Sequence, residues 1–262
     1  MMRRPDLPDN SVSIGTASSE KALIYKSATI FERRRRILRE ARAMISGSGY
    51  ENFSIRELAR RAEVAQKTLY NAFGSRENII ITAIYQYSND FAEHTQYLHP
   101  EHTLEGRLER AIKVHSRNLQ LRPYATAVMA IYNTTSSDTS IRQAIRKLSN
   151  DALRPFADHL AARRQLATNV TPDGYSERVT SFMYCTLSSW CLGEIPDSAM
   201  VESMAETLAM VTLASTKGAV KKEAGDWLQH IRTRSPEWER MRAQSAVRPP
   251  SQRATARLSR NG

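Results

Sequence analysis

Five polar residues between positions 66 and 71 carry groups that recognise nucleic acid. The carboxamides of Gln66 and Asn71 can pair with adenine, and the ammonium group of Lys67 can bond to guanine. The hydroxyl groups of Thr68 and Tyr70 can hold phosphate oxygens. A catalytic site would need a different set, with a nucleophile or an acid–base pair. The chemistry that these residues predict is therefore recognition of DNA bases and phosphates.

Two short helices are needed to present these groups. Leu69 and Phe73 are four residues apart and predict the buried side of a helix, which leaves the polar residues mostly on the other side. An earlier helix is predicted from about Ser54, because Ser54 followed by Glu57 three residues later is typical of a capping box. Val64 lies in the sharp turn between the two helices. This order predicts a helix-turn-helix, whose second helix enters the major groove of DNA.

The stretch from Arg34 to about Tyr85 resembles the DNA-binding domain of the TetR family of transcriptional regulators. The motifs that carry the resemblance are Gly49-Tyr50, Phe53-Ser54-Ile55, Leu58-Ala59, Thr68-Leu69-Tyr70, Phe73, Ser75-Arg76-Glu77 and Ile79. Two residues depart from the family pattern. Ala72 stands where the family often has a His or Tyr that helps to hold phosphate, and Glu63 stands where a turn glycine is common. A left-handed Glu63 would cost on the order of 1 kcal/mol.

The resemblance and the side-chain chemistry together divide the predicted DNA contacts. Gln66, Lys67 and Asn71 are predicted to read bases. The phosphate contacts are predicted to come from Thr68, Tyr70, Arg76 and the helix start at Ser54. Arg34, within the run Arg33–Arg36, is predicted to add electrostatic support.

Positive charge is concentrated at the two ends of this 262-residue chain, whose net charge is +11. Residues 31–78 contain 11 Lys and Arg against 6 Asp and Glu, and residues 219–262 contain 10 against 4. An isolated run such as Arg33–Arg36 usually only solvates a helix end. Beside a helix-turn-helix, the same run favours contact with a polyanion.

Helical periodicity along the rest of the chain predicts an all-α fold with four parts. We expect a disordered N-terminal arm over 1–28, a three-helix DNA-binding domain over 29–78, a larger helical domain over 79–218 and a basic, partly disordered extension over 219–262. The predicted helices of the larger domain begin with one from Ser75 to about Leu98, which Pro100 is expected to stop. The others lie near 104–120, 123–133, 138–164, 174–192 and 197–218, with prolines at several boundaries.

The resemblance also implies partners. These are a double-stranded DNA operator, a second copy of the chain and a small-molecule effector, with dimerisation through the helices near 174–192 and 197–218. Candidate effector contacts are aromatic or sulfur side chains of the larger domain, although ordinary core packing would produce the same spacing. They are Tyr124, Met129, Tyr132, Phe182 and Trp190.

The mechanism that follows is a dimeric repressor whose recognition helices enter successive major grooves, about 34–36 Å apart. A small molecule would release it by favouring a conformation that no longer fits DNA. The alternative is an activator, or a constitutive or architectural DNA-binding regulator, without an effector. A filled core in the larger domain would favour that alternative.

Enzymatic activity is not predicted, because the chain shows no catalytic constellation and no glycine-rich phosphate loop. His94, His99 and His102 lie close in sequence, but they straddle Pro100 and lack the regular spacing of metal ligands. The sequence therefore predicts neither a metal site nor a cofactor.

Composition favours a protein of the cytoplasm. Cys185 and Cys191 are the two cysteines and exclude a disulfide framework. No run of about 18 apolar residues predicts a membrane span. The N-terminal residues lack the apolar stretch of a signal peptide.

Overall fold

The fold is all-α, as predicted. The computed structural model describes residues 15–134 and 139–247, with side chains from residue 29 onward. Eleven helices occupy these ranges: α1 (Gly15–Ser48), α2 (Ile55–Arg61), α3 (Gln66–Phe73), α4 (Arg76–His94), α5 (Leu104–Gln120), α6 (Arg122–Asn133), α7 (Thr139–Ala162), α8 (Pro172–Cys191), α9 (Asp197–Ser215), α10 (Ala219–Thr233) and α11 (Pro236–Gln244). None of the helices in these ranges combines the length and apolar character that a membrane span requires.

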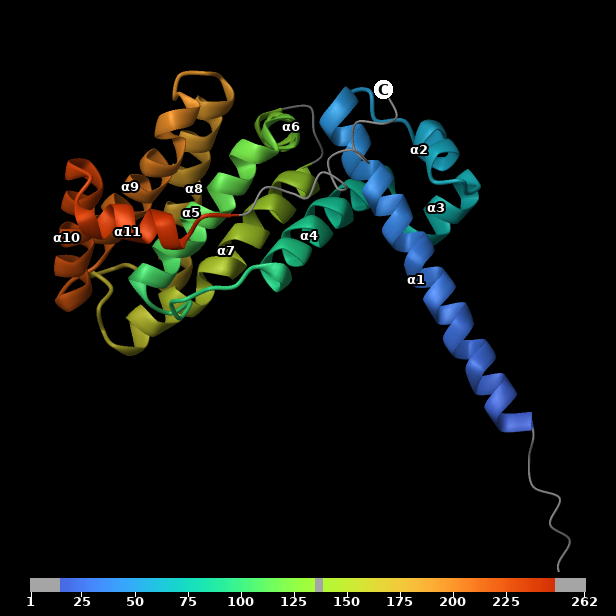
Figure 1. Cartoon of the computed structure of the whole chain (residues 1–262), viewed down its shortest axis with the longest axis horizontal. Coiled ribbons are helices and arrows are strands. Elements are labelled where there is room, and N and C mark those ends of the chain that lie inside the picture. Colours follow the sequence, from blue (N-terminus) through green and yellow to red (C-terminus); the bar gives the residue numbers. More distant parts are fainter. Residues whose placement is uncertain (1–14, 135–138, 248–262) are drawn as a thin grey trace, which may run out of the picture.

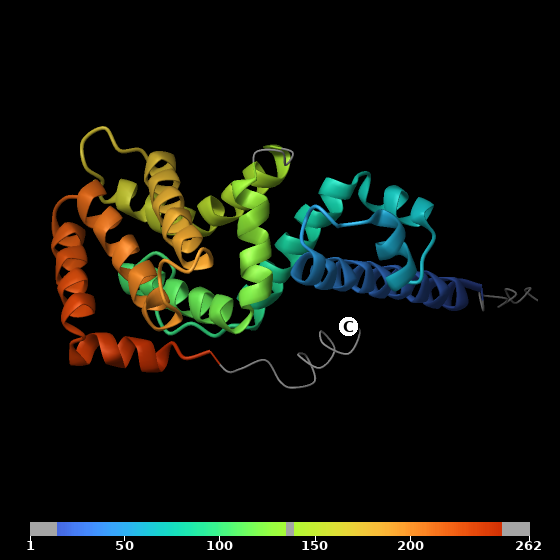
Figure 2. The same cartoon turned by 90° about the horizontal axis from the view of Figure 1, so that it is seen from above.

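The molecule has two unequal parts. Helices α1–α3 lie at one end, α5–α11 form the larger part at the other end, and α4 lies between them (Figures 1 and 2). The N-terminal half of α1 projects away from the rest of the molecule in both views. Helix α4 is the element that joins the two parts.

The first helix is longer than predicted. It begins at Gly15 instead of residue 29, so residues 15–28 of the predicted disordered arm are helical. Residues 1–14 of that arm lie outside the described residues. Extending an existing helix adds one hydrogen bond per ordered residue, and the segment after Gly15 contains no proline or further glycine to stop it. The fourth helix is shorter than predicted and ends at His94, six residues before Pro100.

The core of the small part extends into the large part. Apolar side chains of α1, α2, α3 and α4 pack together, including Leu38, Leu58, Leu69 and Ile80. The same cluster includes buried isoleucines of α6 and α7, such as Ile131. A displacement of α4 therefore affects packing in both parts.

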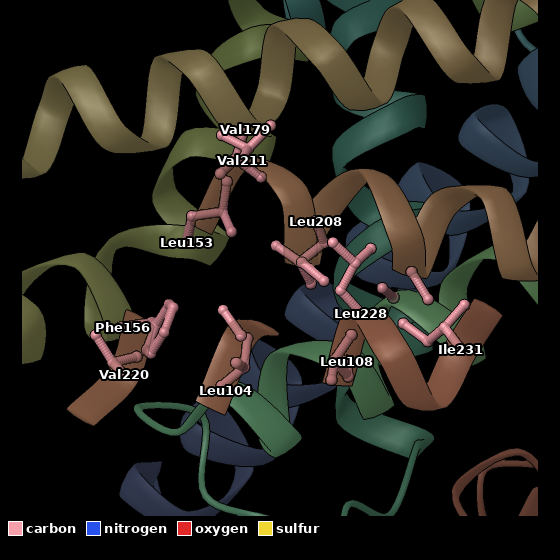
Figure 3. Packing of buried hydrophobic residues seen from close by; sticks show 14 of the residues in the cluster. Leu104, Leu108, Leu153, Phe156, Val179, Leu208, Val211, Val220, Leu228 and Ile231 are labelled. Carbon is pink, nitrogen blue, oxygen red and sulfur yellow. The ribbon is translucent and has the colours of Figure 1, made fainter. Parts of the chain in front are cut away.

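A second core joins helices that are far apart in sequence. Figure 3 shows side chains of α5, α7, α8, α9 and α10 in contact, among them Leu108, Phe156, Leu208 and Leu228. Trp238 of α11 is fully buried in the same cluster.

Residues 219–244 are thus part of the core, which differs from the basic, partly disordered extension that was predicted. Their helical period places Val220, Ala224, Leu228 and Ile231 on one buried face of α10. Their basic side chains also pair within the fold, since Arg234 and Arg242 donate to the Glu202 carboxylate of α9 at 2.8 and 3.0 Å. Residues 248–262 of the predicted tail lie outside the described residues.

Candidate DNA-binding surface and ligand cavity

The recognition helix is oriented as its periodicity predicts. Leu69 and Phe73 are buried, whereas Gln66, Lys67 and Asn71 are exposed. Tyr70 is 48% exposed. Thr68 is half-buried at the edge of this face.

The turn before α3 takes the left-handed conformation. Glu63 has φ 52°. The backbone amide of Glu63 donates a hydrogen bond to the Arg60 carbonyl at 3.2 Å, and that of Val64 donates one to the Ala59 carbonyl at 3.0 Å. This pair of bonds is a Schellman motif, which usually has glycine at the left-handed position. The expected strain at Glu63 is therefore present.

The start of α2 is capped from one side only. The Ser54 hydroxyl accepts a hydrogen bond from the Glu57 amide at 3.4 Å, which leaves its own hydrogen able to donate to a phosphate. The Glu57 carboxylate accepts bonds from Arg60 and Arg61 instead of completing the predicted capping box. Hydrogen bonds from Arg60 and then Arg61 lower the pKa of Glu57 to about 2.

Arg34 braces the end of the recognition helix. Its Nη1 donates to the Ala72 carbonyl at 3.2 Å, and its guanidinium lies 4.3 Å from the centre of the Phe73 ring. Arg34 thus makes a structural contact to α3, and its electrostatic support of DNA binding stays a prediction.

Arg76 is directed into the protein. Its Nε donates to the Phe53 carbonyl at 3.1 Å, its Nη2 donates to the Tyr50 carbonyl, and the guanidinium stacks 4.3 Å from the Tyr50 ring. These contacts tie α4 to the loop before α2. They favour a positioning role in place of the predicted phosphate contact, because the donors that would reach phosphate are engaged in the DNA-free chain.

The larger part contains a cavity of about 240 Å³ between α4, α5, α6, α7, α8 and α9. Two of the predicted effector contacts, Tyr124 and Met129, line it. The Tyr124 hydroxyl is buried and has no hydrogen-bond partner among the described residues, so it is able to donate to a bound molecule.

The structure places the other three predicted effector residues elsewhere. The Tyr132 hydroxyl accepts a bond from Arg146 Nη1 at 2.9 Å, and Trp190 is fully buried with its indole donating to Asp197 at 2.8 Å. Phe182 is 58% exposed on the outside of α8. An apolar helical stripe does not distinguish a cavity wall from solid core or from an outer face, which is why these positions could not be separated by spacing.

Sequence reasoning missed the polar part of the cavity wall. Arg107 and His115 of α5 line the cavity together with Asn118. A signal was available, because Arg107 and His115 fall on the same helical face as the apolar residues Leu104, Leu108 and Ala111. Charged or polar residues within an apolar stripe indicate a buried polar site.

Burial sets the charges of this wall. It lowers the pKa of His115 to about 3, raises the pKa of Tyr124 and raises that of Tyr184 to about 12, so these three groups are neutral near pH 7. Burial also lowers the pKa of Arg107 to about 10, which still leaves that guanidinium protonated. The cavity wall therefore combines neutral donors with a buried cation.

A buried ionic network holds the connection between α4 and α5. The Glu109 carboxylate accepts bonds from the backbone amides of Leu98 and His99, each at 2.9 Å, and from Lys113 Nζ at 2.6 Å. Burial opposes ionisation of Glu109, but these bonds outweigh it and lower its pKa to about 2. His99 is thus engaged with Glu109, and within the described ranges no group of three or more His, Cys, Asp or Glu is arranged to hold a metal ion.

A three-helix unit with an exposed polar third helix, followed by a larger helical domain, defines a class: helix-turn-helix DNA-binding proteins. Residues 37–83 match the sequence model of the tetR family of bacterial regulatory proteins. The DNA-binding segment of the chain is therefore similar to that of the TetR family of transcriptional regulators, and the all-α fold agrees with this similarity.

Individual relatives are similar to different extents. The HTH-type transcriptional repressor KstR of Mycobacterium tuberculosis is 28% identical over 158 residues, which cover 59% of this chain and 71% of that protein. KstR of Rhodococcus jostii is 43% identical over 53 residues, which cover 20% of this chain and only 25% of that protein. The crystal structure of a TetR-family regulator from Rhodococcus sp. superimposes with a TM-score of 0.54 at 16% identity, covering 69% of this chain and 98% of that one. At this identity the superposition supports the fold alone.

Proposed function

We propose that this chain is a homodimeric, sequence-specific repressor that a small molecule releases from its DNA operator. The observation that carries this proposal is that α3 exposes a polar face while its buried face packs in the same core as α4. Helix α4 also forms part of the cavity wall. The name of the M. tuberculosis relative as a transcriptional repressor supports the sign of regulation.

The residues of the DNA-binding surface have separate roles in this proposal. Gln66, Lys67 and Asn71 read base edges in the major groove. Tyr70, Thr68 and the start of α2 at Ser54 hold phosphates. Arg34 and Arg76 position α3 and the loop before α2 through the contacts described above.

The dimer is proposed to form through the outer faces of α8 and α9. Phe182, Leu192 and Met210 are exposed large apolar side chains of this region, with exposed fractions of 58%, 76% and 40%. Cys185 is a small exposed residue on the same face of α8 as Phe182. Pairing this surface with its symmetry mate would remove the apolar side chains from water and satisfy the self-complementarity of a twofold interface.

Release from DNA is proposed to act through α4. Ile84 belongs to the core shared with the DNA-binding domain and also lines the cavity. Tyr87, one turn further along α4, lines the cavity too. A ligand that fits only one position of α4 favours the corresponding separation of the two recognition helices. The size of the effect is limited by the difference in ligand affinity between the two conformations.

The test is fluorescence anisotropy of the purified protein on the DNA upstream of its own coding region, with scrambled DNA as competitor and salt as the variable. Binding that survives the competitor supports sequence-specific regulation. Equal binding to both DNAs that disappears as salt rises contradicts specificity for that DNA and would leave only electrostatic attraction. Specific binding that no cavity ligand weakens would favour a constitutive regulator or an activator.

A further inference from the structure

We propose that the cavity binds an amphipathic anion, with an apolar body between α5, α7, α8 and α9 and a single carboxylate paired with Arg107. This inference rests on the proposed function, because it names the chemical class of the effector. It depends on the surroundings of one buried arginine and on the composition of the wall next to it.

Arg107 is a buried cation to which no carboxylate of the described residues is bonded. Arg107 is only 8% exposed, and no hydrogen bond joins it to a carboxylate of the described residues. Glu101 attracts it at longer range, but this attraction is smaller than the repulsion from Arg110. Its one hydrogen bond to the described residues runs from Nη1 to the Ala152 carbonyl at 2.7 Å, while Nε is buried without a partner. Buried charges in folded proteins are normally paired, so an unpaired guanidinium in a cavity wall indicates that the missing partner is supplied by a ligand.

The geometry of the free groups favours a carboxylate. Nε and Nη2 lie on one edge of the planar guanidinium, and this edge matches the two oxygens of a carboxylate in a bidentate pair. Burial lowers the pKa of Arg107 to about 10, so the cation is present throughout the neutral range. A bound anion would replace the hydration that the guanidinium loses on burial.

The rest of the wall favours an apolar body. Ala111, Leu153, Leu187 and Leu208 line the cavity from four helices. The cavity residues of α5 extend from Arg107 to Asn118, which corresponds to about 16 Å along the helix axis. The neutral hydroxyl of Tyr124 and the neutral ring of His115 lie towards the other end of α5. Arg110, one turn from Arg107, is a second cation of the wall, but it is half-buried and its Nη1 donates to the carbonyls of His99 and Gly106 at 3.1 and 3.0 Å. Arg107 therefore stands at the cationic end of an elongated space whose other end is uncharged.

The experiment compares pairs of linear compounds that differ only in the charge of one end. Octanoate and decanoate are titrated by calorimetry into the DNA-free protein, in parallel with octanol and decanol. The variants are Arg107→Met, which removes the cation at similar volume, and Arg154→Met, which makes the same change at an exposed arginine of α7 outside the cavity. Thermal unfolding of each variant confirms that it is folded.

We expect decanoate to bind the wild-type protein at least tenfold more tightly than decanol. Arg107→Met should weaken decanoate binding roughly 10- to 100-fold, the effect of losing a charge-assisted hydrogen-bonded pair, and should leave decanol binding unchanged. Arg154→Met should retain the preference for the acid.

Equal affinity for the acid and the alcohol in the wild-type protein would overturn the proposal, as would a preference that survives Arg107→Met. Failure of both octanoate and decanoate to bind would also overturn it, because the cavity would then not accept a linear apolar chain that ends in a carboxylate. These outcomes are independent of the operator, since DNA is absent. If decanoate binds through Arg107 but leaves the anisotropy of the DNA complex unchanged, the anion site stands and the proposed release mechanism fails.

Discussion

Replacement of Arg76 by methionine distinguishes a positioning arginine from a phosphate-binding one. The structure assigns its guanidinium to the carbonyls of Tyr50 and Phe53 and to the face of the Tyr50 ring. The resemblance of the Ser75-Arg76-Glu77 motif to the TetR family had suggested a phosphate contact. The two roles predict different changes in stability and in the salt dependence of DNA binding.

The loss of stability can be calculated from these contacts. A hydrogen bond from a charged donor contributes about 1.5–3 kcal/mol. Two such bonds are lost, but the loop carbonyls lie in a half-buried position and regain water, so we use the lower limit and expect a loss of about 3 kcal/mol in the free energy of unfolding. For a domain of this size, that loss lowers Tm by roughly 6–12 °C.

The DNA assay supplies the second measurement. If Arg76 only positions the loop, Arg76→Met weakens binding at temperatures where the variant is folded but leaves the slope of log K against log salt unchanged. If it neutralised one phosphate in each half-site of a dimer, the slope would become shallower by about 1.8. Circular dichroism melting and anisotropy from 50 to 200 mM salt measure both quantities.

A Tm within about 2 °C of the wild type, together with a shallower salt slope, would refute the positioning role. Such a result would mean that Arg76 leaves its carbonyl partners when DNA binds. The conservative variant Arg76→Lys separates charge from geometry, because lysine keeps the charge but not the fork that reaches both carbonyls.

Four further predictions follow from the same structure. Tyr70→Ala should weaken binding to all DNA sequences, whereas Lys67→Ala should also relax base preference by about tenfold at one position; equal losses on all sequences for both variants in an anisotropy panel would reject this division. Glu63→Gly should stabilise the protein by about 0.5 kcal/mol in urea unfolding, because relief of left-handed strain exceeds the entropy cost of glycine, and Glu63→Ala, which keeps the Cβ, should give no gain. Phe182→Asp should shift the protein from dimer to monomer in sedimentation velocity, and an unchanged dimer would place the interface elsewhere. Glu109 has a pKa of about 2 in the folded chain, below its unfolded value of about 4.3. Its ionised form therefore contributes about 3 kcal/mol to the free energy of unfolding above pH 4.3, and this contribution is lost as the pH falls towards 2. In Glu109→Gln, the decrease of Tm with falling pH over this range should be smaller.

Local sequence patterns were sufficient for the small domain. The Ser54 and Ser75 caps lie immediately before α2 and α4, and the spacing of Leu69 and Phe73 correctly separates the buried and exposed sides of α3. These features depend on neighbours within one helical turn, so their physics is contained in a few consecutive residues.

The direction of the long charged side chains was decided by tertiary structure. Arg76 meets carbonyls 23 and 26 residues earlier in the chain, and Arg34 meets a carbonyl 38 residues later. Spacing along one helix contains no information about such partners. The same motif therefore fits a phosphate contact and an internal brace equally well until the loop before α2 is in place.

The cavity and the C-terminal helices depended on tertiary structure even more strongly. Tyr124 and Trp190 are both aromatic residues of predicted helices. In the structure, however, Tyr124 lines the cavity and Trp190 is fully buried in packed core. The apolar face of α10 follows from its helical period, but its burial required α5 and α9. Whether a buried side chain meets solid core, empty space or an unpaired charge such as Arg107 is decided by which helices surround it, and six different helices form this cavity.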